Sequence, residues 1–236
     1  MTTTVTYEPH ELPTTLTGFT PQQPKPATPT LWLVDIERHR EAAARLAPDL
    51  LDAHEHERVT RFFHDQDRDL YRTSHVALRL LLAAHLALPP AEIPFTRLPC
   101  PGCGDPHGRP AVTGAAVHHS LSHTGGLAVI ALATTPVGVD VERLPSIDTV
   151  TTTARSLHPR ETTELAATPP AEAPAAFARA WTRKEAYLKG LGIGLGRDPS
   201  LDYVGTGPAP TALPGWTITD VHVPTGYTAA VAVAHP

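Results

Sequence analysis

Residues 137–142 read V-G-V-D-V-E and form the segment that most restricts how this chain can fold. Valine alternates with glycine and two acids, which is the period-two pattern of a strand with one apolar face. Side chains two positions apart lie on the same face of a strand, so we expect Asp140 and Glu142 to point toward one place. Two carboxylates on one face favour a hard divalent cation. The segment therefore predicts both a strand and a metal site.

A third carboxylate belongs to a later segment, A-W-T-R-K-E-A-Y-L-K-G, which predicts a helix. Glu185 and Lys189 stand four residues apart and share one side of that helix. Such a pair is usually a surface salt bridge worth about 0.5 kcal/mol or less. If the helix packs near the strand, Asp140, Glu142 and Glu185 become three oxygen ligands beside a lysine. That set is typical of Mg²⁺ held against a pyrophosphate.

The remaining pattern alternates strands with helices and predicts a soluble α+β protein. Strands are predicted at residues 31–36, 127–133, 216–223 and 227–234. Helices are predicted at 37–46, in the second part of 58–88, at 149–167 and at 171–190. Pro136 separates the strand at 127–133 from the one at 137–142, which favours a hairpin between them.

A weak internal repeat indicates two structurally similar halves. The similar segments are L-V-D-I-E at 33–37 with G-V-D-V-E at 138–142, and G-L-A-V-I-A at 126–131 with G-Y-T-A-A-V at 226–231. An active site is expected in the cleft between such halves. The expected domains are an extended N-terminal arm at 1–29, an N-terminal α+β half at 30–135, and a C-terminal α+β half with the metal site at 136–236.

The composition limits the partners of the protein. The net charge is −5, which argues against a general affinity for nucleic acid or for anionic membranes. No apolar run is long enough for a membrane helix, and the start of the chain lacks a signal-peptide pattern. Cys100 and Cys103 are the only cysteines, which agrees with a reducing compartment. We therefore expect a cytoplasmic protein that meets any anionic ligand with a local cationic patch.

Several segments carry groups that bind phosphate. G-R-P at 108–110 pairs a flexible backbone with a cation and a rigid ring, and S-H-T-G at 122–125 offers hydroxyl, imidazole and amide donors. A serine hydrolase is not indicated, because G-x-S-x-G does not surround the serine. The candidate phosphate ligands are Arg58, Arg109, Ser122, His123 and Lys189.

The predicted helix within 58–88 has an apolar face and a cationic one. Arg68, Arg72, His75 and Arg79 recur at spacings of three and four residues, which places them on one face. A stripe of this kind is as typical of a solvated helix face as of a ligand surface. Neighbouring segments must decide between the two interpretations.

The loop L-P-C-P-G-C-G-D-P-H-G-R-P contains a possible zinc site. Cys100, Cys103 and His107 have the spacing C-x2-C-x3-H. Structural zinc takes four ligands, and no fourth is obvious in the sequence. The alternative is a glycine- and proline-rich turn with incidental cysteines, so the sequence leaves zinc binding open.

Together these groups indicate phosphoryl chemistry. If a hydroxyl attacks a pyrophosphate, Mg²⁺ and Lys189 can neutralise charge on the bridging and leaving oxygens. Glu185 could accept the hydroxyl proton, directly or through water, although a carboxylate bound to a metal is a weaker base. His119 and His123 are competing candidates for this proton.

The order of the motifs resembles a known family. G-R-P, S-H-T-G, G-V-D-V-E and W-T-R-K-E-A-Y-L-K follow one another as in the Sfp-type 4′-phosphopantetheinyl transferases, and the resemblance extends from E-R-V-T-R-F-F to the end of the chain. It implies a pseudo-twofold pair of α+β halves. It also implies an enzyme that moves the phosphopantetheine arm of coenzyme A onto a serine of an acyl or peptidyl carrier protein, releasing adenosine 3′,5′-bisphosphate. Such carriers belong to polyketide, nonribosomal peptide and fatty acid synthases, many of them in secondary metabolism.

The resemblance implies roles for individual residues as well. Asp140, Glu142 and Glu185 match the magnesium ligands, and the implied catalytic residues are Glu185, Lys189 and Asp140, with Glu185 proposed as base. The implied coenzyme A contacts are Arg58, Gly108, Arg109, Pro110, Ser122, His123 and Lys189. One departure is Glu55, which stands where the family often has a basic residue. Arg68, Arg72 or Arg79 would have to compensate in holding the 3′-phosphate.

Two other functions stay open. A magnesium-dependent hydrolase of nucleotide pyrophosphates would use the same acids, with water in place of the carrier serine. A non-catalytic interaction module would be built on a zinc loop at residues 100–107. The sequence does not decide which carriers are modified or whether acylated coenzyme A is accepted; the chain is expected to be a monomer. Arg179, Arg183 and Arg197 are candidates for docking an acidic carrier surface.

Overall fold

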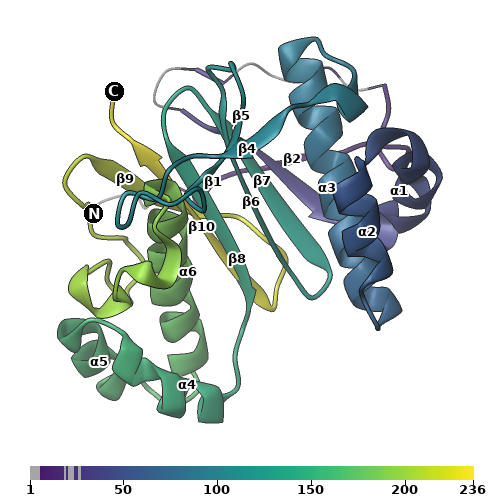
Figure 1. Cartoon of the computed structure of the whole chain (residues 1–236). Coiled ribbons are helices and arrows are strands. Elements are labelled where there is room, and N and C mark those ends of the chain that lie inside the picture. The colour runs from purple at the N-terminus through teal and green to yellow at the C-terminus, as the bar shows by residue number, and fades with distance from the viewer. Residues whose placement is uncertain (1–5, 19, 21–23, 26–27) are drawn as a thin grey trace.

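The computed structural model describes residues 6–18, 20, 24–25 and 28–236, and it has the mixed α+β fold that the sequence predicts (Figure 1). The strands are β1 (Thr6–Tyr7), β2 (His10–Glu11), β3 (Thr30–Asp35), β4 (Phe95–Arg97), β5 (Pro110–Val112), β6 (His118–Thr124), β7 (Leu127–Ala133), β8 (Val137–Arg143), β9 (Trp216–Val221) and β10 (Tyr227–Ala234). The α-helices are α1 (Ile36–Leu50), α2 (Ala53–Thr60), α3 (Asp65–Leu86), α4 (Ile147–Thr153), α5 (Pro159–Ala166) and α6 (Ala173–Leu191). Short 3₁₀ turns are η1 (Pro90–Glu92), η2 (Ala154–Ser156), η3 (Gly194–Gly196) and η4 (Pro199–Leu201).

The two halves of the chain share one topology. In the described residues the strands form two four-stranded sheets, ordered β2-β3-β7-β6 and β1-β9-β10-β8, beside the small sheet β4-β5. Each half runs strand, helices, strand, strand, and in each the last strand lies between the other two, as β3-β7-β6 and β8-β10-β9. The predicted boundary at residue 135 falls in the turn between β7 and β8.

The sheets stack face to face, and helices cover their outer sides (Figure 1). Strand β7 is buried along its whole length. Its even-numbered residues, such as Ile130, pack with α1 and α3, while its odd-numbered residues, such as Val129, pack against β8 and β10 of the other sheet. This two-sided burial explains why residues 127–133 are continuously apolar instead of alternating.

The predicted hairpin between β7 and β8 is wrong. β7 pairs with β3 on one edge and with β6 on the other, so it has no free edge for a third partner. The chain instead crosses to the second sheet after Pro136, and β8 pairs antiparallel with β10. A local turn signal could not show that both edges of β7 are taken by distant strands.

Strand β8 meets β6 at the seam between the sheets through side chains instead of a backbone ladder. The amide of Val139 donates to Ser120 Oγ at 3.0 Å, and the amide of Val141 donates to Ser122 Oγ at 3.4 Å. Ser122 Oγ in turn donates to Asp140 Oδ1 at 2.8 Å. The serines of β6 therefore accept the backbone amides on the edge of β8 that has no strand partner, and Ser122 orients Asp140.

The described part of the N-terminal segment is anchored to both sheets. Strand β1 pairs in parallel with β9, and β2 pairs in parallel with β3. Leu12 and Leu16 are 1% and 0% exposed. Part of the predicted arm, residues 1–5, 19, 21–23 and 26–27, lies outside the described residues. The arm is thus tied to the core by two buried leucines that were not singled out as core residues.

Two predicted helices differ from the structure. Helix α1 runs to Leu50, beyond the predicted end at residue 46, and it includes Pro48 in its last turn. The helix predicted at 149–167 is divided into α4 and α5, since a capping box at His158 and Glu161 begins a new helix. In the described part of the chain, no helix combines the length and the apolar composition needed to cross a membrane.

Strand β8 and helix α6 touch at their backbones. A Cβ atom on Gly138 would lie 2.0 Å from the carbonyl oxygen of Ala186 and 2.3 Å from the nitrogen of Gly190. Non-bonded contacts of a Cβ atom are longer than about 3 Å, so only glycine permits this approach of the two backbones. Asp140 follows on the same face of the strand. The missing side chain therefore lets α6 pack directly against the strand that bears the acids.

We expect Gly138→Ala to lower the free energy of unfolding by about 3 kcal/mol, because the helix backbone must move to admit a methyl group. Urea unfolding followed by circular dichroism measures the change. Gly207→Ala is the matched control: no atom lies within 4 Å of an added Cβ and its φ is not positive. The control should change stability by less than about 1 kcal/mol. Equal effects in the two variants would contradict the tight contact.

Candidate active site at the seam

Asp140 is the most enclosed acid of the site. It is 2% exposed, and its Oδ1 accepts hydrogen bonds from Ser122 Oγ at 2.8 Å and from Lys189 Nζ at 2.5 Å. Its Oδ2 is buried and has no hydrogen-bond partner among the described residues. A buried carboxylate oxygen without a partner is unfavourable unless a further positive group completes its environment. Oδ2 is thus the atom of Asp140 that is free to bind a cation.

Glu142 and Glu185 add negative charge beside Asp140. Burial, followed by the charge of Asp140, raises the pKa of Glu142 to about 7, and Glu185 contributes to this shift. Burial and Asp140 likewise raise the pKa of Glu185, while Lys189 lowers it. The predicted convergence of the three acids is therefore visible in their mutual repulsion, which one lysine only partly offsets.

The three acids fit a divalent cation by chemistry and charge. All are oxygen donors, and the half-buried glutamates are harder to ionise until a cation approaches. The arrangement is not a closed cage. Among the described residues, the ligand atoms of Cys100, Cys103 and His107 all lie within 4.8 Å of one another. The three acids do not form such a group, so their carboxylates are spaced more widely.

A large cavity opens beside the acids. Its volume is about 1110 Å³, and it is lined by α2, α3, the β4–β5 loop and β6 from the first half and by the end of α6 from the second. Lys189 and Ser122, the two groups that hold Asp140, are part of its wall. Every residue that the resemblance implies as a coenzyme A contact lines this cavity, namely Arg58, Gly108, Arg109, Pro110, Ser122, His123 and Lys189.

The β4–β5 loop reaches the cavity through tight backbone contacts. A Cβ on Gly108 would lie 2.5 Å from the carbonyl oxygen of Leu98, so the loop closes only with glycine at this position. Arg109 Nη1 donates to the carbonyl oxygen of Gly190 at 2.7 Å, across the seam. Arg109 Nε is buried without a partner among the described residues, and burial lowers the pKa of the guanidinium. The loop therefore presents a partly unsatisfied cation to the cavity.

Arg79 does not take the place of the basic residue that Glu55 replaces, although the cationic stripe suggested that it could hold the 3′-phosphate. It is fully buried, its Nε donates to Glu55 Oε2 and its Nη2 to Asp52 Oδ2, both at 2.6 Å. Glu55 is thus the partner of a structural arginine. Arg68 and Arg72 pair with acids on their own helix and do not line the cavity. The stripe is accordingly a structural feature of α3, and Arg58 remains as the phosphate candidate of this region.

Sequence reasoning did not single out the cavity residues Arg61, Arg97 and Tyr71, and it named His75 only as part of the cationic stripe. Arg61 stands three residues after Arg58, and that helical spacing was a usable signal. Tyr71 and His75 are four residues apart on α3, and their rings stack at 3.8 Å. Burial lowers the pKa of His75 to about 4, so the ring is neutral at pH 7. Arg97 had no local signal, because its place depends on the pairing of β4 with β5.

The histidine candidates for the general base both line the cavity. His119 is 2% exposed, and burial, followed by His118 and Arg109, lowers its pKa to about 4. Burial also lowers the pKa of His123. Both imidazoles are therefore neutral at pH 7, and the lowered pKa makes each a weaker base than an ordinary histidine. Their position does not decide between them and Glu185.

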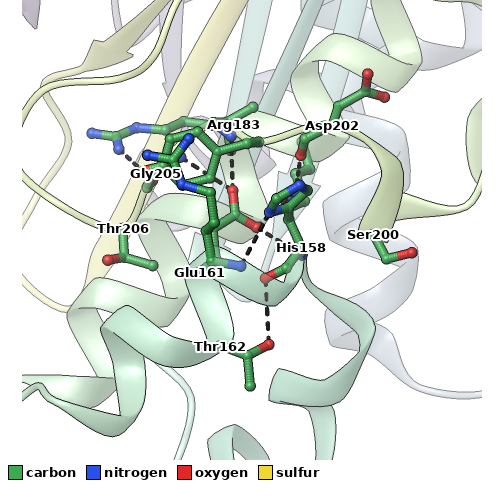
Figure 2. Close-up of polar contacts among 12 residues, drawn as sticks. His158, Glu161, Thr162, Arg183, Ser200, Asp202, Gly205 and Thr206 are labelled. Atoms are coloured by element: carbon green, nitrogen blue, oxygen red, sulfur yellow. Dashed lines mark hydrogen bonds and ion pairs between the residues drawn. The ribbon is translucent and has the colours of Figure 1, made fainter.

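Two cations that directly precede Glu185 on α6, Arg183 and Lys184, are structural. Glu161 is fully buried and accepts from the amides of Val204 at 2.7 Å and Gly205 at 3.1 Å (Figure 2). Its Oε2 pairs with Lys184 Nζ at 2.8 Å. Arg183 is also fully buried; it pairs with Asp220 and donates to carbonyl oxygens of the 205–208 loop. Arg183 is therefore not accessible to a carrier protein. Its predicted role in carrier docking, which was based on its charge, is wrong.

The other docking candidates are more accessible. Arg179 donates to the carbonyl oxygen of Thr206 at 3.0 Å and is half-buried. Arg197 pairs with Asp202 at 2.7 Å and keeps 37% of its side chain exposed. These two arginines stay predictions for carrier docking.

The sequence of this chain is similar to those of known proteins. The profile of the 4′-phosphopantetheinyl transferase superfamily matches residues 136–223, which contain the acids of β8 and all of α6. The 4′-phosphopantetheinyl transferase HetI of Nostoc sp. is 28% identical over 213 residues, which are 86% of each chain. Sfp of Bacillus subtilis is 26% identical over 188 residues, or 76% of this chain and 80% of that protein. The 4′-phosphopantetheinyl transferase psf-1 of Bacillus pumilus is 31% identical over 136 residues, or 57% and 54%. The predicted resemblance to Sfp-type 4′-phosphopantetheinyl transferases is thereby confirmed.

Proposed function

We propose that this enzyme transfers the 4′-phosphopantetheine group of coenzyme A to a serine hydroxyl of an acyl or peptidyl carrier protein. One observation carries the proposal: the implied coenzyme A contacts, far apart in the sequence, all line one cavity, and Lys189 and Ser122 are among them. These two side chains hold Asp140. A pyrophosphate in the cavity would therefore lie beside the three acids.

Asp140, Glu142 and Glu185 are the residues that would hold Mg²⁺. When bound, the ion would neutralise charge on the pyrophosphate oxygens. The buried, partner-free Oδ2 of Asp140 and the raised pKa values of Glu142 and Glu185 support this assignment. Calcium also takes oxygen ligands, so assays of the site should compare the activity with Mg²⁺ and with Ca²⁺.

The other side chains bind the substrate and orient it. Lys189 and His123 donate to phosphate oxygens, Ser122 at the cavity wall orients Asp140 and Lys189, and Arg58 neutralises further phosphate charge. The serine oxygen of the carrier forms a bond to the phosphorus next to pantetheine, and the bond from that phosphorus to the bridging oxygen breaks. Adenosine 3′,5′-bisphosphate leaves with that oxygen. The serine proton passes to Glu185, to water, or to one of His119 and His123.

The carriers are proposed to belong to polyketide, nonribosomal peptide or fatty acid synthases. The negative net charge supports a protein partner met by local cations instead of nucleic acid or a membrane surface. The enzyme is proposed to act as a cytoplasmic monomer, which light scattering on the purified protein tests. Incubation with Mg²⁺, coenzyme A and a panel of apo carriers should add the mass of one phosphopantetheine to at least one carrier. Rapid release of adenosine bisphosphate from coenzyme A without any carrier would favour the hydrolase instead.

Arg58→Gln should raise KM for coenzyme A about 10-fold or more, because a charge-assisted hydrogen bond to phosphate is worth about 1.5–3 kcal/mol. The turnover number should change less than about twofold, since the residue lies away from the acids and contributes uniform binding. Arg40→Gln is the control, as Arg40 is on α1 and outside the cavity. A normal KM in Arg58→Gln would remove Arg58 from the phosphate site.

Magnesium should raise the melting temperature more at about pH 8 than at about pH 5.5, because the cation must displace protons from the glutamates at low pH. The pKa of Glu142 is raised to about 7 in the folded protein, above the ordinary value. Its ionisation therefore lowers stability as pH rises from about 4.5 to 7, and a bound cation relieves that loss. Scanning calorimetry with and without Mg²⁺ measures the difference. Equal shifts at both pH values, or a full shift in Asp140→Asn, would contradict the assignment.

A further inference from the structure

The β4–β5 loop carries a second cluster of metal-ligand side chains, separate from the acids of β8. One ligand atom from each of Cys100, Cys103 and His107 lies within 4.8 Å of the other two. Cys103 Sγ and His107 Nε2 are 3.0 Å apart. In a tetrahedral site with zinc–ligand bonds of about 2.0–2.3 Å, neighbouring ligand atoms are about 3.3–3.8 Å apart. The three side chains are thus already arranged at nearly the spacing that one zinc ion requires.

A fourth ligand lies in the same loop. Asp105 Oδ2 is 3.5 Å from Cys103 Sγ, which is the edge length expected for a shared tetrahedral ion. Asp105 is outside the group of ligand atoms that all lie within 4.8 Å of one another, so its exposed side chain must move toward Cys100 and His107 to bind the same ion. The sequence pattern C-x2-C-x3-H did not indicate this residue, because it falls between two ligands. Asp105 is therefore the candidate for the fourth ligand that the spacing lacked.

The backbone around the cysteines is organised to support a metal. The amide of Gly102 donates to Cys100 Sγ at 3.4 Å, and the amide of Cys100 donates to the carbonyl oxygen of Asp105 at 2.8 Å. Gly104 has a positive φ of 83°, which lets the chain reverse between the ligands. Hydrogen bonds to a ligating sulfur stabilise its negative charge and fix its direction. Both cysteines are free thiols in the structure.

The loop lies across the seam and forms part of the cavity wall. A Cβ on Gly102 would lie 3.1 Å from Ile193 Cδ1, so the cysteine turn packs against the end of α6. His107 and the following Gly108 line the cavity. An ion bound at His107 would therefore fix the backbone immediately before Gly108 and Arg109. Apart from these contacts, residues 101–107 are exposed and bury little apolar surface that could hold the loop.

We propose that Cys100, Cys103, His107 and Asp105 bind one structural Zn²⁺ that holds the coenzyme A side of the cavity in shape. Two thiolates and an imidazole favour zinc over Mg²⁺, which prefers oxygen ligands. The four residues are positioning residues: they act through Gly108 and Arg109, not on the reacting atoms. The effect on coenzyme A rests on the proposed function, whereas zinc binding does not.

Metal analysis of the tag-free protein, expressed with added zinc and kept reduced, tests the site directly. We expect about one zinc ion per chain in the wild type. The zinc content of Cys103→Ser and of His107→Ala should be lower by a factor of about 10 or more. His222→Ala is the matched control, since this histidine has a 68% exposed side chain outside the loop, and it should keep its zinc. Zinc-free wild type, a Cys100–Cys103 disulfide in its place, or full zinc in both variants would overturn the site.

Cobalt substitution gives a readout that needs no variant to fold. Co²⁺ added to the metal-free wild type should produce sulfur-to-cobalt charge-transfer absorption and the visible bands of a tetrahedral ion, which one equivalent of Zn²⁺ removes. Only octahedral cobalt bands would overturn the proposal. Asp105→Asn should weaken zinc binding about 10-fold or more, and unchanged affinity would remove Asp105 as the fourth ligand.

The consequence for the cavity is read from kinetics. The zinc-free His107→Ala variant, assayed with Mg²⁺ and a carrier, should show KM for coenzyme A raised about 10-fold and a turnover number changed less than about twofold. An unchanged KM would overturn the role of the ion in the cavity. Zinc binding without transferase activity would contradict the proposed function but not the zinc site. Transferase activity in a protein that binds no zinc would contradict the zinc site but not the proposed function.

Discussion

Asp140→Asn is expected to lower the turnover number about 1000-fold. The substitution keeps the size of the side chain and removes its charge, so the cation site loses its most enclosed ligand. A metal ion supplies several kcal/mol of charge stabilisation, and each 1.4 kcal/mol corresponds to a factor of ten in rate. Lys189 would lose the carboxylate that positions it, which adds to the effect. Carrier mass gain over time measures the rate.

The fold of Asp140→Asn should survive, because the repulsion among the three acids falls as the pair with Lys189 is lost. We expect a melting temperature within about 3 °C of the wild type, corresponding to about 1 kcal/mol. Asp148→Asn, an exposed acid in the first turn of α4, is the control and should stay within about twofold in rate. Near-normal turnover in Asp140→Asn would remove the three-acid site.

Glu161→Ala should lower the free energy of unfolding by about 3–5 kcal/mol, because it leaves a buried ammonium without its carboxylate. Glu161 and Lys184 are 0% and 2% exposed, and Glu161 also accepts the amides of Val204 and Gly205. The loss would loosen α6 from the 198–208 loop that packs beside it (Figure 2). Chemical denaturation measures the change, with activity recorded on the fraction that remains folded.

Two variants make that experiment specific. Glu161→Gln keeps the acceptor for the two amides but loses the charge, so its loss should lie between those of the wild type and Glu161→Ala. Glu172→Ala is the exposed control at the start of α6, where the side chain makes no capping hydrogen bond, and it should change stability by less than about 0.5 kcal/mol. A loss in Glu161→Ala as small as that control would show that the network does not stabilise α6.

Sequence reasoning succeeded where the determining interactions are local. The alternation in residues 137–142 placed Asp140 and Glu142 on one face because strand geometry depends on adjacent residues alone. The four-residue spacing of Glu185 and Lys189 placed both on one side of α6 for the same reason. The glycine in V-G-V-D-V-E has a second role that the pattern did not reveal, because the close approach of α6 comes from the tertiary fold.

It failed where burial decides the role of a charge. Arg79 and Arg183 have the same local appearance as surface arginines, but each is fully buried and paired with acids distant in the sequence. Their partners, Glu55 and Asp220, are 24 and 37 residues away. Helical periodicity identifies a face and not what covers it, so the charge stripe and the carrier-docking suggestion could not be tested before the fold was known.

The topology was only partly accessible for a similar reason. The repeat at 126–131 and 226–231 correctly marked the central strands of the two sheets, β7 and β10. The other pair of similar segments, 33–37 and 138–142, related the first strands of the two halves, β3 and β8. The hairpin error arose because edge occupancy is a property of the whole sheet. The cavity residue Arg97 was missed because its place depends on the pairing of β4 with β5, whereas the helical spacing of Arg61 from Arg58 was a signal that went unused.

The most direct test of the account measures both products of one reaction, with purified enzyme, Mg²⁺, coenzyme A and an apo carrier. Intact-mass analysis reports the modified carrier, and chromatography reports adenosine 3′,5′-bisphosphate from the same sample. We predict that the two products appear in equal amounts, and that both disappear in Asp140→Asn or when the carrier serine is changed to alanine. Adenosine bisphosphate released with no gain in carrier mass, or no product on any acyl or peptidyl carrier, would contradict the proposed transfer.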